Sequence, residues 1–132
     1  MSDLAAARDF LRKAETALAA ADLLLKPGVT EGACNRAYYA MFDAARAALL
    51  VRGHRTDEAS SKTHRGLIAA FGLILVRDGM VDPALGRAFN RMHDIRVRAD
   101  YASGAPTLKD ADWAVSRAET FVAALREQFF AP

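Results

Sequence analysis

NRAYYAMFDAARAALL, residues 35–50, is the stretch that decides the fold. Its large apolar residues recur every three or four positions, which is the period of a helix that buries one face. Tyr38, Phe42 and Leu49 lie on that face, and Arg46 lies among them, one helical turn after Phe42. A guanidinium on an apolar face needs an anionic partner, because burying an unpaired charge is costly. The stretch therefore predicts a core helix and raises the question of what its arginine binds.

Clusters of glycine and proline divide the chain into five segments of helical length. The segments are rich in Ala, Leu, Arg and Glu, and strand-like alternation is absent. The predicted helices cover about Asp3–Leu25, Thr30–Arg52, Ser61–Arg77, Pro83–Tyr101 (with Asp82 as N-cap) and Thr107–Phe130. The sequence therefore predicts an all-α fold, an up-and-down antiparallel helical bundle of about five helices, in one domain over residues 1–132.

The composition limits the possible functions. With 18 basic and 16 acidic residues the formal net charge is +2, so any contact with nucleic acid must come from a local patch. The single cysteine, Cys34, excludes an internal disulfide and a multi-cysteine zinc site, and paired Glu-x-x-His motifs are absent, so we expect no metal and no cofactor. No apolar run approaches the roughly 20 residues of a membrane span, and the start of the chain does not resemble a secretion signal. We therefore expect a cytoplasmic protein that makes no membrane contact.

A second inward-facing arginine, Arg96, occurs in HDIRVRADY, residues 93–101. It falls inside the apolar arc of the fourth predicted helix, and His93 and Asp100 flank it along the same edge. Two interpretations of Arg46 and Arg96 remain open. In the functional one, Arg96 lines a cleft open to a phosphate, which its planar fork binds through two hydrogen bonds, and tyrosines stack against a base. In the structural one, the arginines pair inside the bundle with carboxylates such as those of Glu15, Asp22, Asp43 and Asp100.

The third predicted helix begins with SKTH, residues 61–64. Lys62 and His64 lie in its first turn, where free backbone N–H groups and the helix dipole attract anions. They can therefore form a phosphate pocket together with Arg96. The alternative is an ordinary helix start, capped by Ser60 or Ser61, with an exposed lysine.

Three motifs in this order, RAYYAMFDAARAALL, SKTHRGLIAAF and RVRADY, resemble the HEPN family of prokaryotic helical domains, and in particular its small stand-alone branch. The resemblance extends over about residues 8–126. It implies a bundle of four or five helices that is often a homodimer. It also implies a protein partner, a minimal nucleotidyltransferase, with which many members form a toxin–antitoxin-like pair. Other members cleave RNA without a metal, through an arginine followed after four to six residues by a histidine.

The resemblance also implies a site for a nucleotide or RNA. Its main residues would be Arg96, Asp100 and Tyr101, and its walls would be Arg36, Tyr39, Lys62 and His64. The chain is then a regulatory module that binds a nucleotide or RNA. The two alternatives are a metal-independent endoribonuclease, and a structural or interaction protein whose arginines form internal salt bridges.

The sequence departs from the ribonuclease motif where the histidine is expected. Asp100 and Tyr101 stand at that distance after Arg96, and an aspartate with an ordinary pKa of about 4 is a poor acid at neutral pH. Arg87 and His93 have the required spacing, but on one helix their side chains point about 120° apart, and they would have to meet across a dimer. The catalytic candidates are therefore Arg96, Asp100 and His93, and no catalytic role is assigned to any of them.

Overall fold

The structure, a computed structural model, describes residues 3–54, 64–101 and 104–131, and of residues 100 and 101 it describes the backbone alone. Its helices are α1 (Asp3–Leu25), α2 (Thr30–Val51), α3 (His64–Ala70), η2 (Phe71–Val76), α4 (Pro83–Tyr101) and α5 (Leu108–Phe130). These described ranges contain no strand, so the prediction of an all-α bundle is confirmed. The predicted boundaries agree to within one residue, apart from the start of the third helix, since residues 61–63 lie outside the described ranges.

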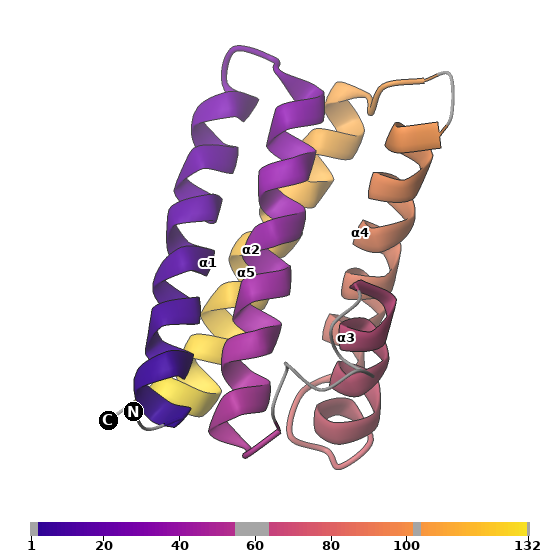
Figure 1. Cartoon of the computed structure of the whole chain (residues 1–132). Helices are drawn as coiled ribbons and strands as arrows, with labels where there is room; N and C mark the ends of the chain where they lie inside the picture. Colours follow the sequence, from indigo (N-terminus) through magenta and orange to yellow (C-terminus); the bar gives the residue numbers. More distant parts are fainter. Residues whose placement is uncertain (1–2, 55–63, 102–103, 132) are drawn as a thin grey trace.

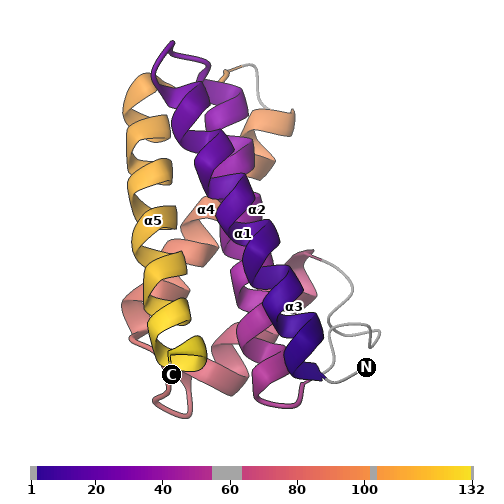
Figure 2. The same ribbon diagram turned by 90° about the vertical axis from the view of Figure 1, so that its left-hand side faces the viewer.

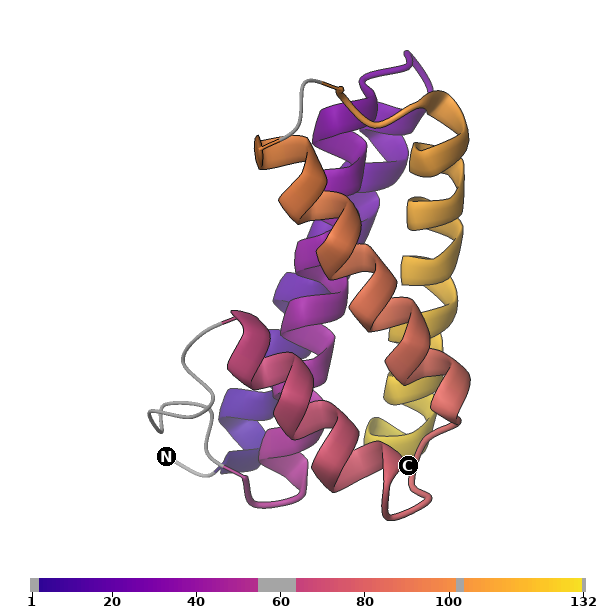
Figure 3. The same cartoon turned by 90° about the vertical axis from the view of Figure 1, so that its right-hand side faces the viewer.

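The helices run up and down along one long axis. α1 and α2 are antiparallel neighbours, and α5 lies beside both of them (Figure 1, Figure 2). α4 crosses α2 obliquely, and α3 with η2 lies next to the first part of α4 (Figure 3). This arrangement places α3 and α4 together over one face of α2, while α1 covers another.

α2 is the central helix, since 13 of its 22 residues are buried. One of its faces is made of alanines. Arg36 and Asp43 lie at the border of this face and line a groove between α1 and α2, which shows that the alanine face turns toward α1. Four of the five buried residues of α1 are also alanines. Small side chains on both helices allow a close approach of the helix axes. We call this contact the alanine seam; on the α2 side it contains Ala33, Ala40, Ala44 and Ala47.

Three phenylalanines join the other half of the bundle. Phe71 of η2, Phe89 of α4 and Phe121 of α5 are fully buried, and their ring centroids are 5.3 to 5.6 Å apart. Aromatic pairs at this separation add to the stability that burial of their surface provides. Since the three rings come from three helical segments, this phenylalanine cluster fixes η2, α4 and α5 relative to one another.

The predicted helix starts at Asp82 and Thr107 are confirmed by their hydrogen bonds. The Asp82 carboxylate accepts the backbone N–H of Ala84 at 2.8 Å, next to Pro83 at the first position of α4. Thr107 and Asp110 form a capping box, in which each side chain accepts the other's backbone N–H at 3.0 Å. These caps set where α4 and α5 begin, and so which of their faces turn inward.

Candidate functional site

Four polar side chains from three helices meet on the face of α2 that carries Tyr38, Tyr39 and Phe42. They are Tyr38 of α2, His64 of α3, and His93 and Arg96 of α4, and we call them the Tyr38 cluster. The Tyr38 hydroxyl is 2.6 Å from His64 Nδ1, although Tyr38 itself is fully buried. The His93 ring centroid is 6.2 Å from that of Tyr38, and Arg96 Cζ lies 5.2 Å from the Tyr38 ring centroid. Residues far apart in the sequence therefore surround one buried phenol.

The structure brings together three of the residues that the sequence singled out, His64, His93 and Arg96. It adds Tyr38, which sequence reasoning placed in the apolar core. The available signal was the hydroxyl, because a tyrosine at a fully buried position normally has a hydrogen-bond partner. Helical periodicity identified the side of α2 that Tyr38 faces, and it contained no information about a histidine 26 positions later in the chain.

Burial shapes the charge state of the cluster. It lowers the pKa of His64, and the positive charge of Arg96 lowers that pKa further. Burial also lowers the pKa of His93; Asp94 opposes that shift, and Arg65 and Arg96 add to it. The pKa of Tyr38 is raised, mainly by burial. At neutral pH both imidazoles are therefore neutral and the phenol keeps its proton.

With both groups neutral, their acidities assign the hydrogen bond between Tyr38 and His64, because a phenol O–H is a stronger donor than an imidazole N–H. The Tyr38 hydroxyl donates to His64 Nδ1, which leaves the proton of the neutral imidazole on Nε2. His93 differs, because its Nδ1 is buried and has no hydrogen-bond partner among the described residues. The cluster thus contains one imidazole that a tyrosine orients and one whose buried nitrogen is unsatisfied.

The lowered pKa values of the two histidines predict that acid destabilises the fold. Below about pH 6.5 the two histidines bind protons in the unfolded chain more readily than in the folded protein, where their pKa values are lower. The free energy of unfolding therefore falls as the pH drops. Urea unfolding of the wild type at about pH 7.5 and about pH 5.5 should therefore show lower stability at the acid value. In a His64→Gln, His93→Gln double variant this difference should shrink. An equal difference in both proteins would contradict the assignment.

Two of the predicted wall residues border the cluster. The Tyr39 ring centroid is 5.8 Å from that of His64 and 5.8 Å from Arg96 Cζ. Arg36 Cζ lies 5.2 Å from the Tyr39 ring centroid, and the Arg36 guanidinium donates to Asn35 Oδ1. The other predicted site residues cannot be placed in this way: Lys62 and the side chains of Asp100 and Tyr101 lie outside the described residues.

Arg46 has a structural role. Its guanidinium lies 4.0 Å from the Phe10 ring centroid and 5.7 Å from that of Phe42, and Nη1 is 3.9 Å from Asp43 Oδ1. Burial raises the pKa of Asp43, and the neighbouring cations, Arg46 first, oppose that shift. Arg46 therefore stacks between helices α1 and α2 and pairs within its own helix, as the structural interpretation holds.

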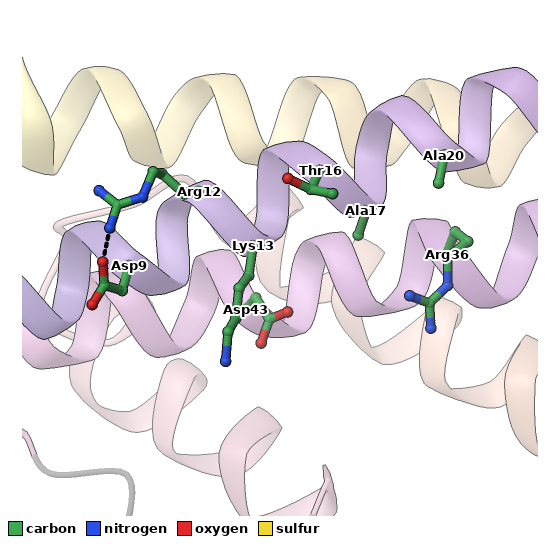
Figure 4. A pocket seen from close by; sticks show the side chains of 8 residues that line it. All are labelled: Asp9, Arg12, Lys13, Thr16, Ala17, Ala20, Arg36 and Asp43. Atoms are coloured by element: carbon green, nitrogen blue, oxygen red, sulfur yellow. Dashed lines mark ion pairs between the residues drawn. The ribbon is translucent and has the colours of Figure 1, made fainter.

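A charged groove of about 730 Å³ runs between α1 and α2. Figure 4 shows the ion pair of Arg12 and Asp9, the side chains of Lys13 and Asp43, and Arg36 farther along α2. Its charged lining consists of three cations, Arg12, Lys13 and Arg36, and two carboxylates, Asp9 and Asp43, so the groove offers a ligand a surplus of only one positive charge. We therefore place the candidate site at the Tyr38 cluster and not in this groove.

The space next to Arg96 is small. A cavity of about 40 Å³ lies between α2 and α4, and Cys34, Asn35 and Met92 line it together with Arg96. Enclosed ligand sites usually measure about 300–1,000 Å³, so this cavity cannot enclose a nucleotide. A ligand of that size has to lie over the surface and present only a small group to Arg96.

Two further kinds of site are not found in the described part of the chain. It holds no group of three or more His, Cys, Asp and Glu side chains arranged for a metal ion. None of its helices is both long and apolar enough to cross a membrane.

An all-α bundle with an arginine and two imidazoles around a buried tyrosine defines a small helical domain with a polar site between α2, α3 and α4. The sequence matches the HEPN domain family over residues 7–128, and the chain belongs to that family. A protein of Methanocaldococcus jannaschii named "Putative toxin" is 37% identical over 109 residues, which are 83% of this chain and 78% of that protein. A "UPF0332 protein" of Thermotoga maritima is 36% identical over 118 residues, which are 88% of this chain and 85% of that protein.

Proposed function

We propose that this HEPN domain binds RNA, and that Arg96 contacts a phosphate at the Tyr38 cluster. The observation that carries the proposal is the position of the Arg96 guanidinium, which lies over the rings of Tyr38 and Tyr39 at 5.2 and 5.8 Å. Cation–π contacts with two rings hold the planar fork in place, and a partly exposed guanidinium in that position suits a phosphate. The cavity beside it is too small for a free nucleotide, which favours a polynucleotide that lies across the surface.

The wider role we propose is that of a toxin-like module. It is supported by membership of the HEPN family and by two relatives from Methanocaldococcus jannaschii that carry the name "Putative toxin". The family resemblance further favours a homodimer in a toxin–antitoxin-like pair with a minimal nucleotidyltransferase. In such a pair the RNA site of the HEPN domain is what the partner would control.

Arg96→Ala should lower the affinity for RNA at least about tenfold. A hydrogen bond to a charged group contributes about 1.5–3 kcal/mol, and 1.4 kcal/mol corresponds to a factor of ten. The fold should lose less, about 0.5–2 kcal/mol, which is the range of a cation–π contact. The affinity is measured by fluorescence anisotropy with an end-labelled RNA pool, and stability by thermal melts.

The matched control for this experiment is Arg12→Ala, which removes an exposed arginine of α1, a helix that contributes no residue to the Tyr38 cluster. Its RNA affinity should equal that of the wild type. If a well-folded Arg96→Ala variant bound RNA as tightly as the wild type, the proposed phosphate contact would be refuted. A loss of about 3–5 kcal/mol in stability would instead support the structural interpretation of Arg96.

One observation favours metal-independent RNA cleavage as a second candidate function. Two neutral imidazoles, His64 and His93, lie beside Arg96 around the same phenol. His93 is the candidate base, because the unprotonated nitrogen of His64 already accepts a hydrogen bond from Tyr38. The neutral His93 imidazole can take the proton of a ribose 2′-hydroxyl while that oxygen attacks the phosphorus and the bond to the 5′-oxygen breaks. The departing 5′-oxygen takes a proton from water, and arginine stabilises the charge on the phosphate.

The same labelled RNA pool tests cleavage when it is incubated with excess EDTA. Cleavage by the wild type that is lost in a well-folded His93→Ala variant would establish the enzymatic function. Intact RNA in the presence of a wild type that binds it would leave the binding module as the function.

A further inference from the structure

Two grooves on the α4–α5 side of the bundle meet at one residue, Arg91. The first measures about 540 Å³, and its charged lining is Arg65, Arg91, His93, Asp94, Arg98 and Asp110. The second measures about 280 Å³ and is lined by Arg87, Arg91, Trp113 and Arg117, among others. Because Arg91 lines both grooves, they form one continuous surface across α4 and α5, which lie next to each other (Figure 3).

Helix geometry explains why α4 supplies the centre of this surface. Arg87, Arg91 and Arg98 fall within about 40° of one another around the helix and span about 16 Å along it. Arg96 points about 180° away from Arg87, toward α2 and the Tyr38 cluster. α4 thus carries its functional arginine on one face and a row of arginines on the opposite face. We call the exposed arginines Arg65, Arg87, Arg91, Arg98 and Arg117, together with Trp113, the arginine track.

The arginines of the track are available to a ligand. Among the described residues none of the five forms an ion pair with a carboxylate, whereas Arg12, Lys26, Arg46 and Arg126 do. Two carboxylates, Asp94 and Asp110, share the surface. Asp110 accepts the Thr107 N–H in the capping box of α5, and this hydrogen bond together with the charges of Arg98 and Arg91 lowers its pKa. Five exposed arginines on one side are a local basic patch in a chain whose net charge is only +2.

Trp113 adds an aromatic surface to the patch. Its ring is half-buried, with Arg91 Cζ at 5.1 Å and Arg117 Cζ at 6.0 Å from the ring centroid. A tryptophan beside guanidinium groups can stack with an unpaired base, while the guanidinium groups contact the adjoining phosphates. The carboxylates of an acidic peptide can pair with the arginines, but they provide no aromatic ring to stack on the indole. A tryptophan among arginines therefore favours single-stranded RNA, which has both phosphates and unpaired bases.

We propose that single-stranded RNA runs along the arginine track and reaches the Tyr38 cluster at His93. His93 is the link, because it lines the larger groove and its ring lies 6.2 Å from Tyr38. This proposal rests on the proposed RNA-binding function and specifies the form of the RNA and its path. Double-stranded RNA binds more weakly along this path, because its bases are already stacked within the helix and are not offered to Trp113.

The single tryptophan of the chain makes the path directly measurable. An unstructured oligouridine should quench the fluorescence of Trp113, and an RNA duplex of equal charge should do so less. Arg91→Ala and Arg117→Ala should each weaken binding about tenfold, which corresponds to about 1.4 kcal/mol, because each removes a phosphate contact. Each should also reduce the magnitude of the slope of log affinity against log salt by about 0.7, the value for one phosphate contact with a single strand. Arg12→Ala should change neither quantity.

The outcomes separate this proposal from the function on which it rests. If oligouridine binding depended on Arg96 but not on Arg91 or Arg117, and left the Trp113 emission unchanged, the track would be refuted while RNA binding stood. If no RNA bound at all, both proposals would fail. Quenching by polyglutamate as strong as that by oligouridine at the same salt concentration would overturn the RNA path in favour of an acidic protein.

Discussion

Phe89→Ala is expected to lower the free energy of unfolding by about 3–5 kcal/mol, the range observed when a buried phenylalanine is truncated. Phe89 is fully buried and contacts the rings of both Phe71 and Phe121. Alanine would remove the contacts that join α4 to η2 and α5 and would leave a cavity between three helical segments. Those segments cannot all move inward, because α4 is also held against α2. The loss is measured by urea unfolding followed by circular dichroism.

Leu73→Ala is the matched control for this substitution. Leu73 lies in η2, two residues after Phe71, and is 60% exposed. A substitution at such a surface position should change stability by no more than about 0.5 kcal/mol. Equal effects of the two variants would show that the phenylalanine cluster does not fix the three segments together.

Ala40→Leu is expected to destabilise the protein by about 1–3 kcal/mol, because it inserts extra volume into a closely packed interface. Ala40 is fully buried and lies in the alanine seam between α1 and α2. Leucine is nearly as good a helix former as alanine, so helix propensity cannot account for a loss. The variant should unfold at lower urea concentration than the wild type, with α1 displaced from α2.

Ala19→Leu tests the same change outside the seam. Ala19 is exposed on α1, so the added side chain meets water and the stability should stay within about 0.5 kcal/mol of the wild type. An Ala40→Leu variant as stable as the wild type would mean that the seam has room for a larger side chain.

The helices were predictable because their signals are local. Apolar periodicity, the capping residues Asp82 and Thr107, and the clusters of glycine and proline all act within a few residues of the helix ends they define. The π-helical stretch η2 was not predicted. Its apolar residues Phe71 and Leu75, both buried, lie four apart, which fits an α-helix equally well. A local pattern cannot distinguish the two hydrogen-bond registers.

The candidate site was predictable only in part, because it depends on contacts between helices. Facing angles placed Arg96 inside the apolar arc of α4 and His93 on the polar edge beside it, and the helix start identified His64. They could not show that all three meet at Tyr38, which comes from a different helix. The same limit applied to Arg46, whose stacking on Phe10 depends on the position of α1.

The two faces of α2 expose this helix to two different kinds of selection. On the alanine seam the tolerance of a position is set by size alone, so serine or glycine is admitted more readily than any large residue, whatever its chemistry. On the face with Tyr38 the side chain must also donate a hydrogen bond to His64. A phenylalanine has nearly the same volume but no hydroxyl, so it is excluded if the cluster is in use. Along a single helix, positions limited by side-chain volume and positions limited by hydrogen bonding therefore lie on two different faces, and each kind recurs with a period of 3.6 residues.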